Sequence, residues 1–350
     1  MAKNPVELTG AGREALGKDQ KLQPILDKPD ATLQNWIEQR KRLRKRWLDL
    51  LGKPTFEKPL QAAETVDHFE AEHFRGTALR QPTGPDARQL VYVLEPKRAL
   101  HFPRPGAVVP FYHPDLMAGY DHAKDAPVAE RPLVQFGSHL ARQGYVAVCT
   151  EAFPYNTVAD PKSDATFAWW RAATRKVLAE NPNWTGMGKL VWDTSLALDL
   201  LLEQPDVDAE RVVVIGHSLG GKMAFYTGCL DERVKAVIAS DFGIGYDFTN
   251  WGDPWYLGSK LRRVRKDLKH HQLLALLAPR AFLLIAGQYD KRESRQYLLE
   301  AQKVYKLYGR GGALGMFDHA SGHQPTREAM LVAYKWLARQ FGLQEVAFDL

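Results

Sequence analysis

The chain has 350 residues, of which 45% are hydrophobic and 25% charged, the proportions of an ordinary water-soluble globular protein. This length accommodates one large α/β domain with additional segments. The net charge of +6 is too small to imply nucleic-acid binding by itself, and no apolar run reaches the roughly 18 residues that a membrane span needs. The first residues lack the apolar core of a secretory signal, so we expect a cytoplasmic protein.

Residues 1–60 predict a polar, helical extension, and we assign residues 61–350 to one main domain. Within the extension, Trp, Ile and Leu recur at near-helical spacing over residues 32–51. The same segment carries a dense basic run at residues 40–46, and such a run can bind nucleic acid or an anionic membrane. We favour an amphipathic helix that docks through its apolar side chains and leaves its basic face in water. We therefore expect no nucleic acid and no membrane as partners.

Further along the chain, strands and helices alternate. Two extended runs, residues 65–74 and 90–94, flank a turn at residues 82–85 and predict antiparallel strands. The strands expected after them cover residues 108–111, 145–149, 212–215, 234–240, 281–286 and 313–317. Helices are expected at residues 132–143, 165–180, 190–203, 219–230 and 326–341. This alternation predicts an α/β fold with a mostly parallel, twisted sheet and helices on both of its faces.

The most informative stretch reads VVVIGHSLGG and covers residues 212–221. Its four β-branched residues predict a buried strand that runs straight into a glycine-rich turn. The turn has the pattern G-x-S-x-G, in which a sharp bend between strand and helix raises a serine hydroxyl above the sheet. Gly216 and Gly220 leave room for this bend because they carry no side chain. Ser218 is therefore the candidate nucleophile.

A serine nucleophile needs a base, and the base needs a carboxylate that orients it. Asp290 lies just past the carboxyl end of the strand predicted at residues 281–286, where open α/β sheets place their chemistry. Asp241, at the end of the preceding strand predicted at residues 234–240, is the main rival. Aspartate is also common in turns, so Asp290 has a structural interpretation as well. We prefer Asp290 as the acid.

His323 is the candidate base, since it lies on a loop between the last predicted strand and the last predicted helix. Gly322 precedes it, and Pro325 suits the first turn of the helix that follows. His319, four residues earlier, competes for the same role. The adjacent glycine and helix favour His323, and His319 is then a supporting or surface residue.

An insertion at about residues 241–261 follows the strand that ends at Ser240. Glycine, proline and aspartate break any regular pattern there, while aromatic residues are frequent. Long loops inside compact domains are usually functional, and Trp251, Trp255 and Tyr256 would offer flat walls for sugars or aromatic rings. The equally weighted alternative is a structural loop held down by its own side chains.

These features resemble an α/β-hydrolase, of the dienelactone-hydrolase-like and acetyl-xylan-esterase-like branch of serine esterases. The resemblance covers about residues 89–343, and it rests on the serine turn together with residues 106–112, 140–150, 192–193 and 322–323. It implies a triad of Ser218, Asp290 and His323. It also implies two backbone N–H donors for the oxyanion, the first from Leu219. Relatives usually have His-Gly where this chain has His113-Pro114, and proline has no N–H, so Tyr112, His113 or Asp115 would supply the second donor.

The function expected from these residues is cofactor-free hydrolysis of carboxylic esters through an acyl-enzyme, on a small-molecule or carbohydrate ester. No histidine and carboxylate spacing matches a known metal site, so we expect no metal. A prolyl-oligopeptidase-like peptidase shares the fold, but the chain before residue 89 is too short for a propeller. A ligand-binding protein on an inactive hydrolase fold is the remaining alternative.

Overall fold

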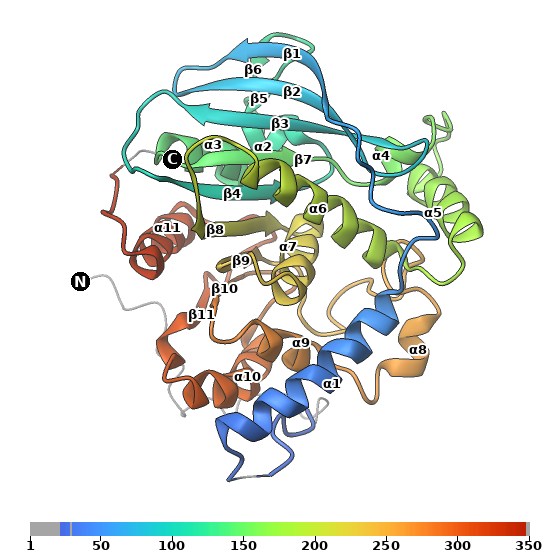
Figure 1. Cartoon of the computed structure of the whole chain (residues 1–350), viewed down its shortest axis with the longest axis vertical. Helices are drawn as coiled ribbons and strands as arrows, with labels where there is room; N and C mark the ends of the chain where they lie inside the picture. The colour runs from blue at the N-terminus through green and yellow to red at the C-terminus, as the bar shows by residue number, and fades with distance from the viewer. Residues whose placement is uncertain (1–21, 29, 348–350) are drawn as a thin grey trace.

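The computed structural model describes residues 22–28 and 30–347, and a nine-stranded sheet forms the centre of this part of the chain (Figure 1). The strand order is β1-β2-β3-β7-β4-β8-β9-β10-β11. The strands are β1 (Glu64–Glu70), β2 (Phe74–Pro82), β3 (Arg88–Pro96), β4 (Arg104–Pro110), β7 (Val146–Thr150), β8 (Val207–His217), β9 (Ala236–Ser240), β10 (Ala281–Ala286) and β11 (Leu314–Asp318). A separate ribbon pairs β5 (Tyr120–Asp121) with β6 (Ala126–Pro127).

The sheet is parallel over most of its width and antiparallel at one edge. Strands β7, β4, β8, β9, β10 and β11 pair in parallel, whereas β1, β2 and β3 run antiparallel to their neighbours. Every residue of β7, β9 and β10 is buried. Parallel strands are joined by helical crossovers that cover both faces, so their side chains are mostly apolar. The predicted α/β class is confirmed.

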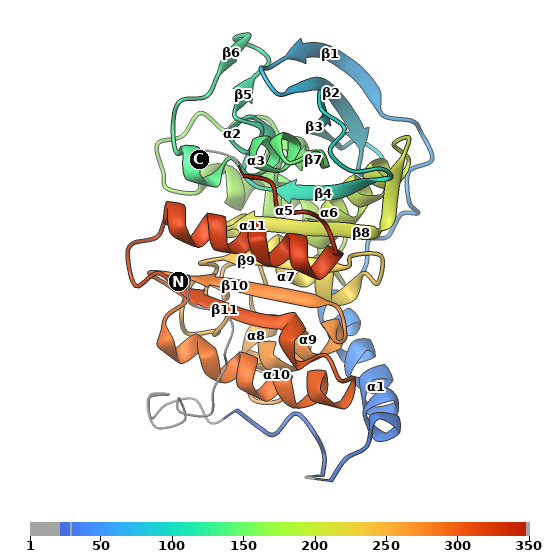
Figure 2. The same ribbon diagram turned by 90° about the vertical axis from the view of Figure 1, so that its left-hand side faces the viewer.

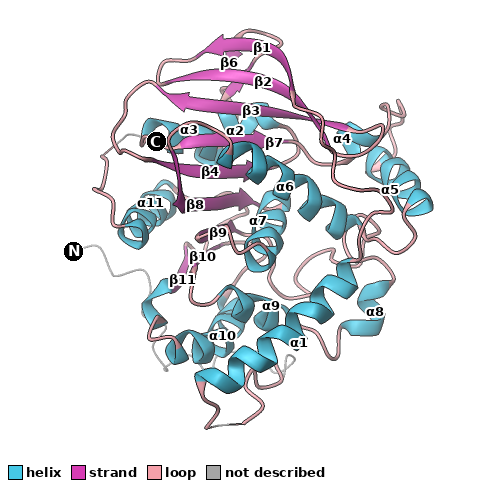
Figure 3. Cartoon of the chain, in the orientation of Figure 1, coloured by secondary structure: helices cyan, strands magenta, loops and turns pink. Residues whose placement is uncertain are grey.

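Helices cover both faces of the sheet. Figure 2 shows α3 (Phe136–Arg142) and α11 (Arg327–Phe341) in front of the strands, and α6 (Gly186–Leu202) and α7 (Leu219–Leu230) lie on the opposite face. The other α-helices are α1 (Leu33–Leu51), α2 (Pro114–Ala118), α4 (Pro154–Thr157), α5 (Ala168–Glu180), α8 (Lys260–Val264), α9 (His270–Leu277) and α10 (Arg295–Leu307) (Figure 3). Among the described residues, no helix is both long and apolar enough to span a membrane.

The predicted elements correspond to observed ones, with differences at the antiparallel edge of the sheet and at the start of α11. The run 65–74, predicted as one strand, is divided between β1 and β2, so three strands replace the expected two. Pro325 precedes the N-cap Thr326 of α11 instead of lying in its first turn. Several observed elements are not among the predicted ones, namely α2, α4, α8, α9, α10 and the β5–β6 ribbon.

Helix α1 is the amphipathic helix expected at residues 32–51. Thr32 caps its N-terminus, with Asn35 completing a reciprocal capping box. Trp36 and Trp47 are fully buried, and the ring of Trp47 stacks on His270 of α9 with centroids 5.8 Å apart. Part of the basic face also holds the helix in place, since Arg44 donates to Leu230 O at the end of α7. The docking interpretation is confirmed for this helix; residues 1–21 lie outside the described residues.

The insertion at residues 241–261 is an irregular, tightly packed loop. Trp251 is fully buried, and its Nε1–H donates to Gly243 O at 2.7 Å. Its ring lies between Tyr226 of α7 and His270 of α9, with centroids 5.6 and 4.5 Å away. The loop therefore continues the hydrophobic core over α7 and α9.

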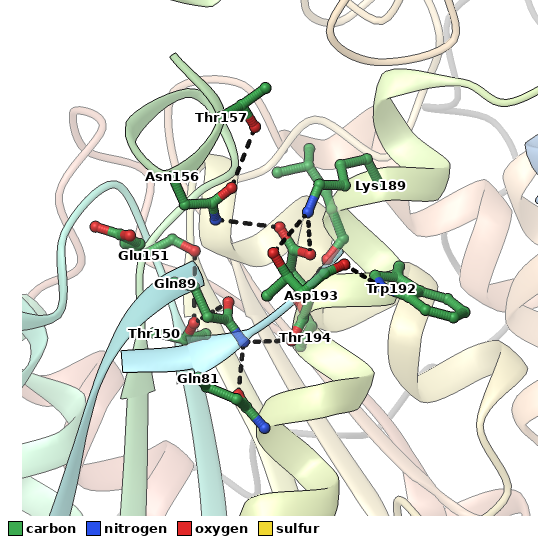
Figure 4. A network of polar contacts seen from close by, with 12 residues as sticks. Gln81, Gln89, Thr150, Glu151, Asn156, Thr157, Lys189, Trp192, Asp193 and Thr194 are labelled. Atoms are coloured by element: carbon green, nitrogen blue, oxygen red, sulfur yellow. Dashed lines mark hydrogen bonds and ion pairs between the residues drawn. The ribbon is translucent and has the colours of Figure 1, made fainter. Parts of the chain in front are cut away.

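A buried polar network joins α6 to the carboxyl end of β7 (Figure 4). At its centre, Lys189 and Asp193, 3% and 0% exposed, form an ion pair one helical turn apart at 2.5 Å. Asn156 of α4 donates to the same aspartate. Gln89 extends the network by donating to Asp193 O and accepting from Thr150. A buried ion pair is tolerated only when further hydrogen bonds satisfy both charges, as they do here. The network fixes the segment that leaves β7, whose Tyr155 packs against His113 with ring centroids 4.1 Å apart.

Candidate active site

Ser218 occupies the sharp turn between β8 and α7, as the sequence predicts. Its backbone lies at φ 56° and ψ −114°, a region that non-glycine residues rarely adopt, and its N–H donates to Ser240 O at 2.8 Å. The flanking glycines are required by space. A Cβ at Gly216 would lie 2.1 Å from Gly220 O, and one at Gly220 would lie 2.0 Å from Pro110 O.

His323 lies against this serine, on the loop between β11 and α11. Its Nε2 is 2.9 Å from Ser218 Oγ, and its Nδ1 is 2.6 Å from Asp241 Oδ2. A carboxylate only accepts hydrogen bonds, so Nδ1 is the donor and Nε2 is free to accept the serine proton. His319, the competing candidate for the base, contacts Ser321 Oγ through its Nδ1 and makes no hydrogen bond to Ser218.

The carboxylate beside His323 differs from the one that we preferred from the sequence. Asp241, and not Asp290, reaches His323. Asp241 directly follows β9, the strand paired with β8, whereas Asp290 follows β10, one strand further away. Both loops are at the carboxyl edge of the sheet, so the position of an aspartate after a strand could not distinguish them. Asp241 contacts His323 because β9, the strand that it follows, is the direct neighbour of β8.

The two aspartates hold each other's loops. Asp241 accepts backbone N–H groups from Gln288, Tyr289 and Asp290, at 3.1, 2.8 and 2.8 Å. Asp290 in turn accepts N–H groups from Gly243 and Ile244, both at 2.7 Å, and the Ser294 hydroxyl at 2.8 Å. Burial raises the pKa of Asp290 to about 6. Asp290 is thus an anchor of the loop that carries Asp241.

Two backbone N–H groups near the serine turn and after β4 are candidates for binding an oxyanion. Leu219 opens α7 and Tyr112 follows β4; neither N–H has a hydrogen-bond acceptor within the described part of the chain. Ala152 N–H donates to Tyr112 O and fixes that residue. The other two candidates belong to α2: His113 is its N-cap, and Asp115 accepts the N–H of Leu116 in its first turn. We take Leu219 and Tyr112 as the candidate donors, and the choice of Tyr112 over His113 and Asp115 stays a prediction.

Two rings pack against the His323 imidazole. His217 lies fully buried beside it, with ring centroids 4.5 Å apart, and its Nδ1 is 3.1 Å from Ser240 Oγ. Burial holds the pKa of His217 well below its usual value, so this ring is neutral. Tyr289 packs edge-on at 5.0 Å and is 39% exposed, which leaves its outer part available to a ligand.

Aromatic residues continue outward from Tyr112. Its ring packs against Trp170 of α5 at 5.7 Å, and Trp170 packs against Trp255 at 5.9 Å. Trp255 is 4% exposed and lies behind the half-exposed Phe167. Trp255 therefore supports this group of rings from the insertion.

The predicted substrate contacts of the insertion are only partly compatible with the structure. Trp251 has no exposed surface, so the prediction that it contacts substrate is wrong and its role is structural. Trp255 and Tyr256 are nearly buried, so any role in binding remains a prediction.

Lys222 is a residue that the sequence analysis missed. It follows Ser218 by one helical turn, is 4% exposed, and donates from Nζ to Asn250 Oδ1 at 2.9 Å. Nζ lies over the rings of Trp251 and Tyr256, 4.8 and 4.1 Å from their centroids. Burial lowers the pKa of Lys222 to about 7, whereas the ring faces favour its charged form. Its spacing from the serine was the available signal.

No group of three or more histidine, cysteine or acidic side chains suited to a metal ion occurs among residues 22–28 and 30–347. A cleft of about 700 Å³ lies between α1, α6 and the end of α7, but its lining includes neither Ser218 nor His323. The candidate chemistry is therefore concentrated at the carboxyl edge of β8 and β9.

The fold and the arrangement of serine, histidine and aspartate are those of the α/β-hydrolases. A model of the Abhydrolase family, Abhydrolase_7, matches residues 14–245, more than half of the chain, and the protein belongs to this family. The match includes helix α1, which the sequence analysis placed in an extension outside the hydrolase pattern.

Relatives agree with this assignment. YtaP of Bacillus subtilis (strain 168) is 27% identical over 43% of the chain and 54% of its own length. Carbohydrate esterase MZ0003, from an unknown prokaryotic organism, is 25% identical over 39% of the chain and 37% of its own length. The chain thus matches about half or less of these relatives.

Solved structures share the fold at low sequence identity. A glucuronoyl esterase from Solibacter usitatus has a TM-score of 0.70 and 18% identity, covering 92% of this chain and 98% of that chain. A promiscuous CE15 esterase from a marine bacterial metagenome has a TM-score of 0.67 and 16% identity, covering 96% of this chain and all of its own.

Proposed function

We propose that the protein is a serine hydrolase of carboxylic esters, with Ser218, His323 and Asp241 as its triad. The observation that carries the proposal is the continuous relay from Ser218 Oγ through the imidazole to a carboxylate, with contacts of 2.9 and 2.6 Å. A serine at a strained turn, a base within hydrogen-bond reach and an orienting acid together constitute an activated nucleophile.

In this mechanism, His323 Nε2 accepts the Ser218 proton as the hydroxyl attacks the ester carbonyl. Asp241 fixes the imidazole through Nδ1 and stabilises its charged form. The N–H groups of Leu219 and Tyr112 stabilise the oxyanion, assisted by the positive end of α7. His323 then protonates the leaving alcohol, and water, activated by the same base, releases the acyl group.

The substrate class that we propose is a carbohydrate ester. Support comes from the names of relatives, which include a carbohydrate esterase and a glucuronoyl esterase. It also comes from the half-exposed rings of Tyr289 and Phe167, since aromatic faces pack well on sugars.

The test combines a covalent probe with turnover. A fluorophosphonate should label the wild type at Ser218 and leave Ser218→Ala unlabelled, and the variant should lose roughly 10⁴–10⁶ in kcat at an unchanged melting temperature. A panel of acetylated sugars, uronate methyl esters and aryl esters, with matched peptide amides, then defines the substrate. Ser218→Ala with a tenth of wild-type activity would refute the nucleophile, and faster amide cleavage would favour a peptidase.

A further inference from the structure

Arg131 lies near the candidate active site and is not used by the mechanism above. It follows the β5–β6 ribbon and has the left-handed backbone values φ 51° and ψ 52°. Non-glycine residues adopt this conformation at a cost of about 1 kcal/mol or more, so the surrounding structure must hold it there. Its guanidinium carbon lies 5.7 Å from the centroid of the Phe111 ring.

Phe111 connects this arginine to the reacting groups. It is 2% exposed, directly precedes Tyr112, and packs against the ring of His217 at 6.4 Å. A Cβ on Gly220, in the first turn of α7, would lie 3.4 Å from it. Phe111 thus lies beside Tyr112 and against the first turn of α7, and Arg131 covers its ring. The charge of Arg131 contributes to the lowered pKa of His217, in agreement with this placement.

Arg131 has no counter-ion among the described residues. No carboxylate lies within ion-pair distance of it, and its side chain makes no hydrogen bond there, in contrast to Arg233, which pairs with Asp231 and Asp199. Its side chain is partly buried, and burial lowers the pKa of Arg131 while leaving it charged. A partly desolvated cation without a partner is unfavourable by itself and binds an anion more strongly than an exposed one.

We propose that Arg131 binds an anionic group of the substrate, namely a carboxylate carried close to the scissile ester. This inference rests on the proposed function and narrows its substrate class to acidic esters. The planar guanidinium, held on a ring face, presents a fork that matches a carboxylate. The carboxylate belongs either to the acyl part or to the alcohol part of the ester, and the experiment separates these cases.

The experiment compares matched esters with and without a carboxylate. On the acyl side, 4-nitrophenyl hydrogen glutarate is paired with 4-nitrophenyl valerate; on the alcohol side, 4-acetoxybenzoate is paired with 4-acetoxybenzamide. In Arg131→Gln, the ratio of kcat/KM for the acidic ester to that for its neutral partner should fall at least tenfold in one pair. Arg131→Lys should retain part of the ratio. Arg310→Gln, which removes an exposed arginine from a distant loop, should leave it unchanged.

A binding measurement separates this inference from the proposed function. Calorimetry with Ser218→Ala should show preferential binding of the acidic ester, and Arg131→Gln in the same background should abolish the preference. Preferential binding of the acidic ester, without hydrolysis of any ester by the wild type, would refute the proposed esterase activity and support the anion site at Arg131. Equal losses on acidic and neutral esters, or an unchanged ratio in both pairs, would overturn the role of Arg131.

Discussion

Replacing Asp241 by asparagine tests the corrected triad most directly. The carboxylate accepts four N–H groups, two on each oxygen: His323 Nδ1 and Gln288 N on Oδ2, and Tyr289 N and Asp290 N on Oδ1. An asparagine must place its NH₂ group against one of these pairs. With the amide oxygen kept on the Tyr289 side, the NH₂ faces the histidine and favours the tautomer with a proton on Nε2, which cannot accept the serine proton.

We expect Asp241→Asn to lower kcat by about 10⁴, the loss known for a triad histidine held in the wrong tautomer, or about 5.4 kcal/mol of transition-state stabilisation. The matched control is Asp290→Asn, which makes the same atomic change in the adjacent loop. The buried carboxylate of Asp290 accepts hydrogen bonds from the N–H groups of Gly243 and Ile244 and from the Ser294 hydroxyl, and it does not contact His323. The variant should therefore lose about 1–3 kcal/mol of unfolding free energy with less than a tenfold change in kcat.

Initial rates on 4-nitrophenyl acetate give the change in kcat of each variant. Denaturant unfolding followed by circular dichroism gives the change in unfolding free energy. A kcat loss in Asp290→Asn larger than that in Asp241→Asn would refute the geometric assignment. It would show that the acid reaches the histidine from β10 during turnover.

Three further predictions concern stability and the serine turn. Burial raises the pKa of Glu151 from 4.5 to about 7. Between pH 4.5 and pH 7 the Glu151 carboxyl is therefore protonated in the folded protein and ionised in the unfolded chain. The unfolding free energy falls by about 3 kcal/mol as pH rises through this window. Glu151→Gln keeps an acceptor for Leu90 N–H, so its stability relative to wild type in urea unfolding should increase by about 2–3 kcal/mol from pH 5 to pH 8; a constant difference would contradict the assignment. Gly220→Ala should abolish fluorophosphonate labelling, because its Cβ would lie 2.0 Å from Pro110 O, and normal labelling would show that the turn adapts. Trp251→Phe should lower the unfolding free energy by roughly 1 kcal/mol, because the hydrogen bond to Gly243 O is lost, and the melting temperature should fall accordingly. The variant should change kcat/KM equally for small and bulky esters, and a selective loss on bulky esters would restore a binding role for Trp251.

The parallel half of the sheet and the serine turn could be predicted from local patterns. The run of β-branched residues before Gly216, and the apolar run at residues 281–286, are signals that lie within the elements they specify. Helix α1 could be predicted for the same reason, because its start at Thr32 and its buried tryptophans all lie within one short segment.

The acid could not be predicted, because it depends on distance across the sheet. Asp241 and Asp290 each follow a buried strand, and only the strand order places the former next to Ser218. The burial of Trp251 was hidden for a similar reason, since its partners Tyr226 and His270 come from two other segments. Arg131 carries no sequence motif, and Lys222 offers only its spacing from Ser218; the surroundings of both side chains appear only in the folded structure.

The reciprocal binding of Asp241 and Asp290 has a consequence for how such a site can change over generations. Each carboxylate is already surrounded by N–H donors of the other's loop, so both positions accept a negative charge before either acts on a histidine. A lineage could therefore exchange the acid between neighbouring strands by a shift of the histidine loop, without first creating a new anion-stabilising pocket. The second aspartate, which today anchors the loop of the first, would preserve an alternative geometry for the proposed triad within the same molecule.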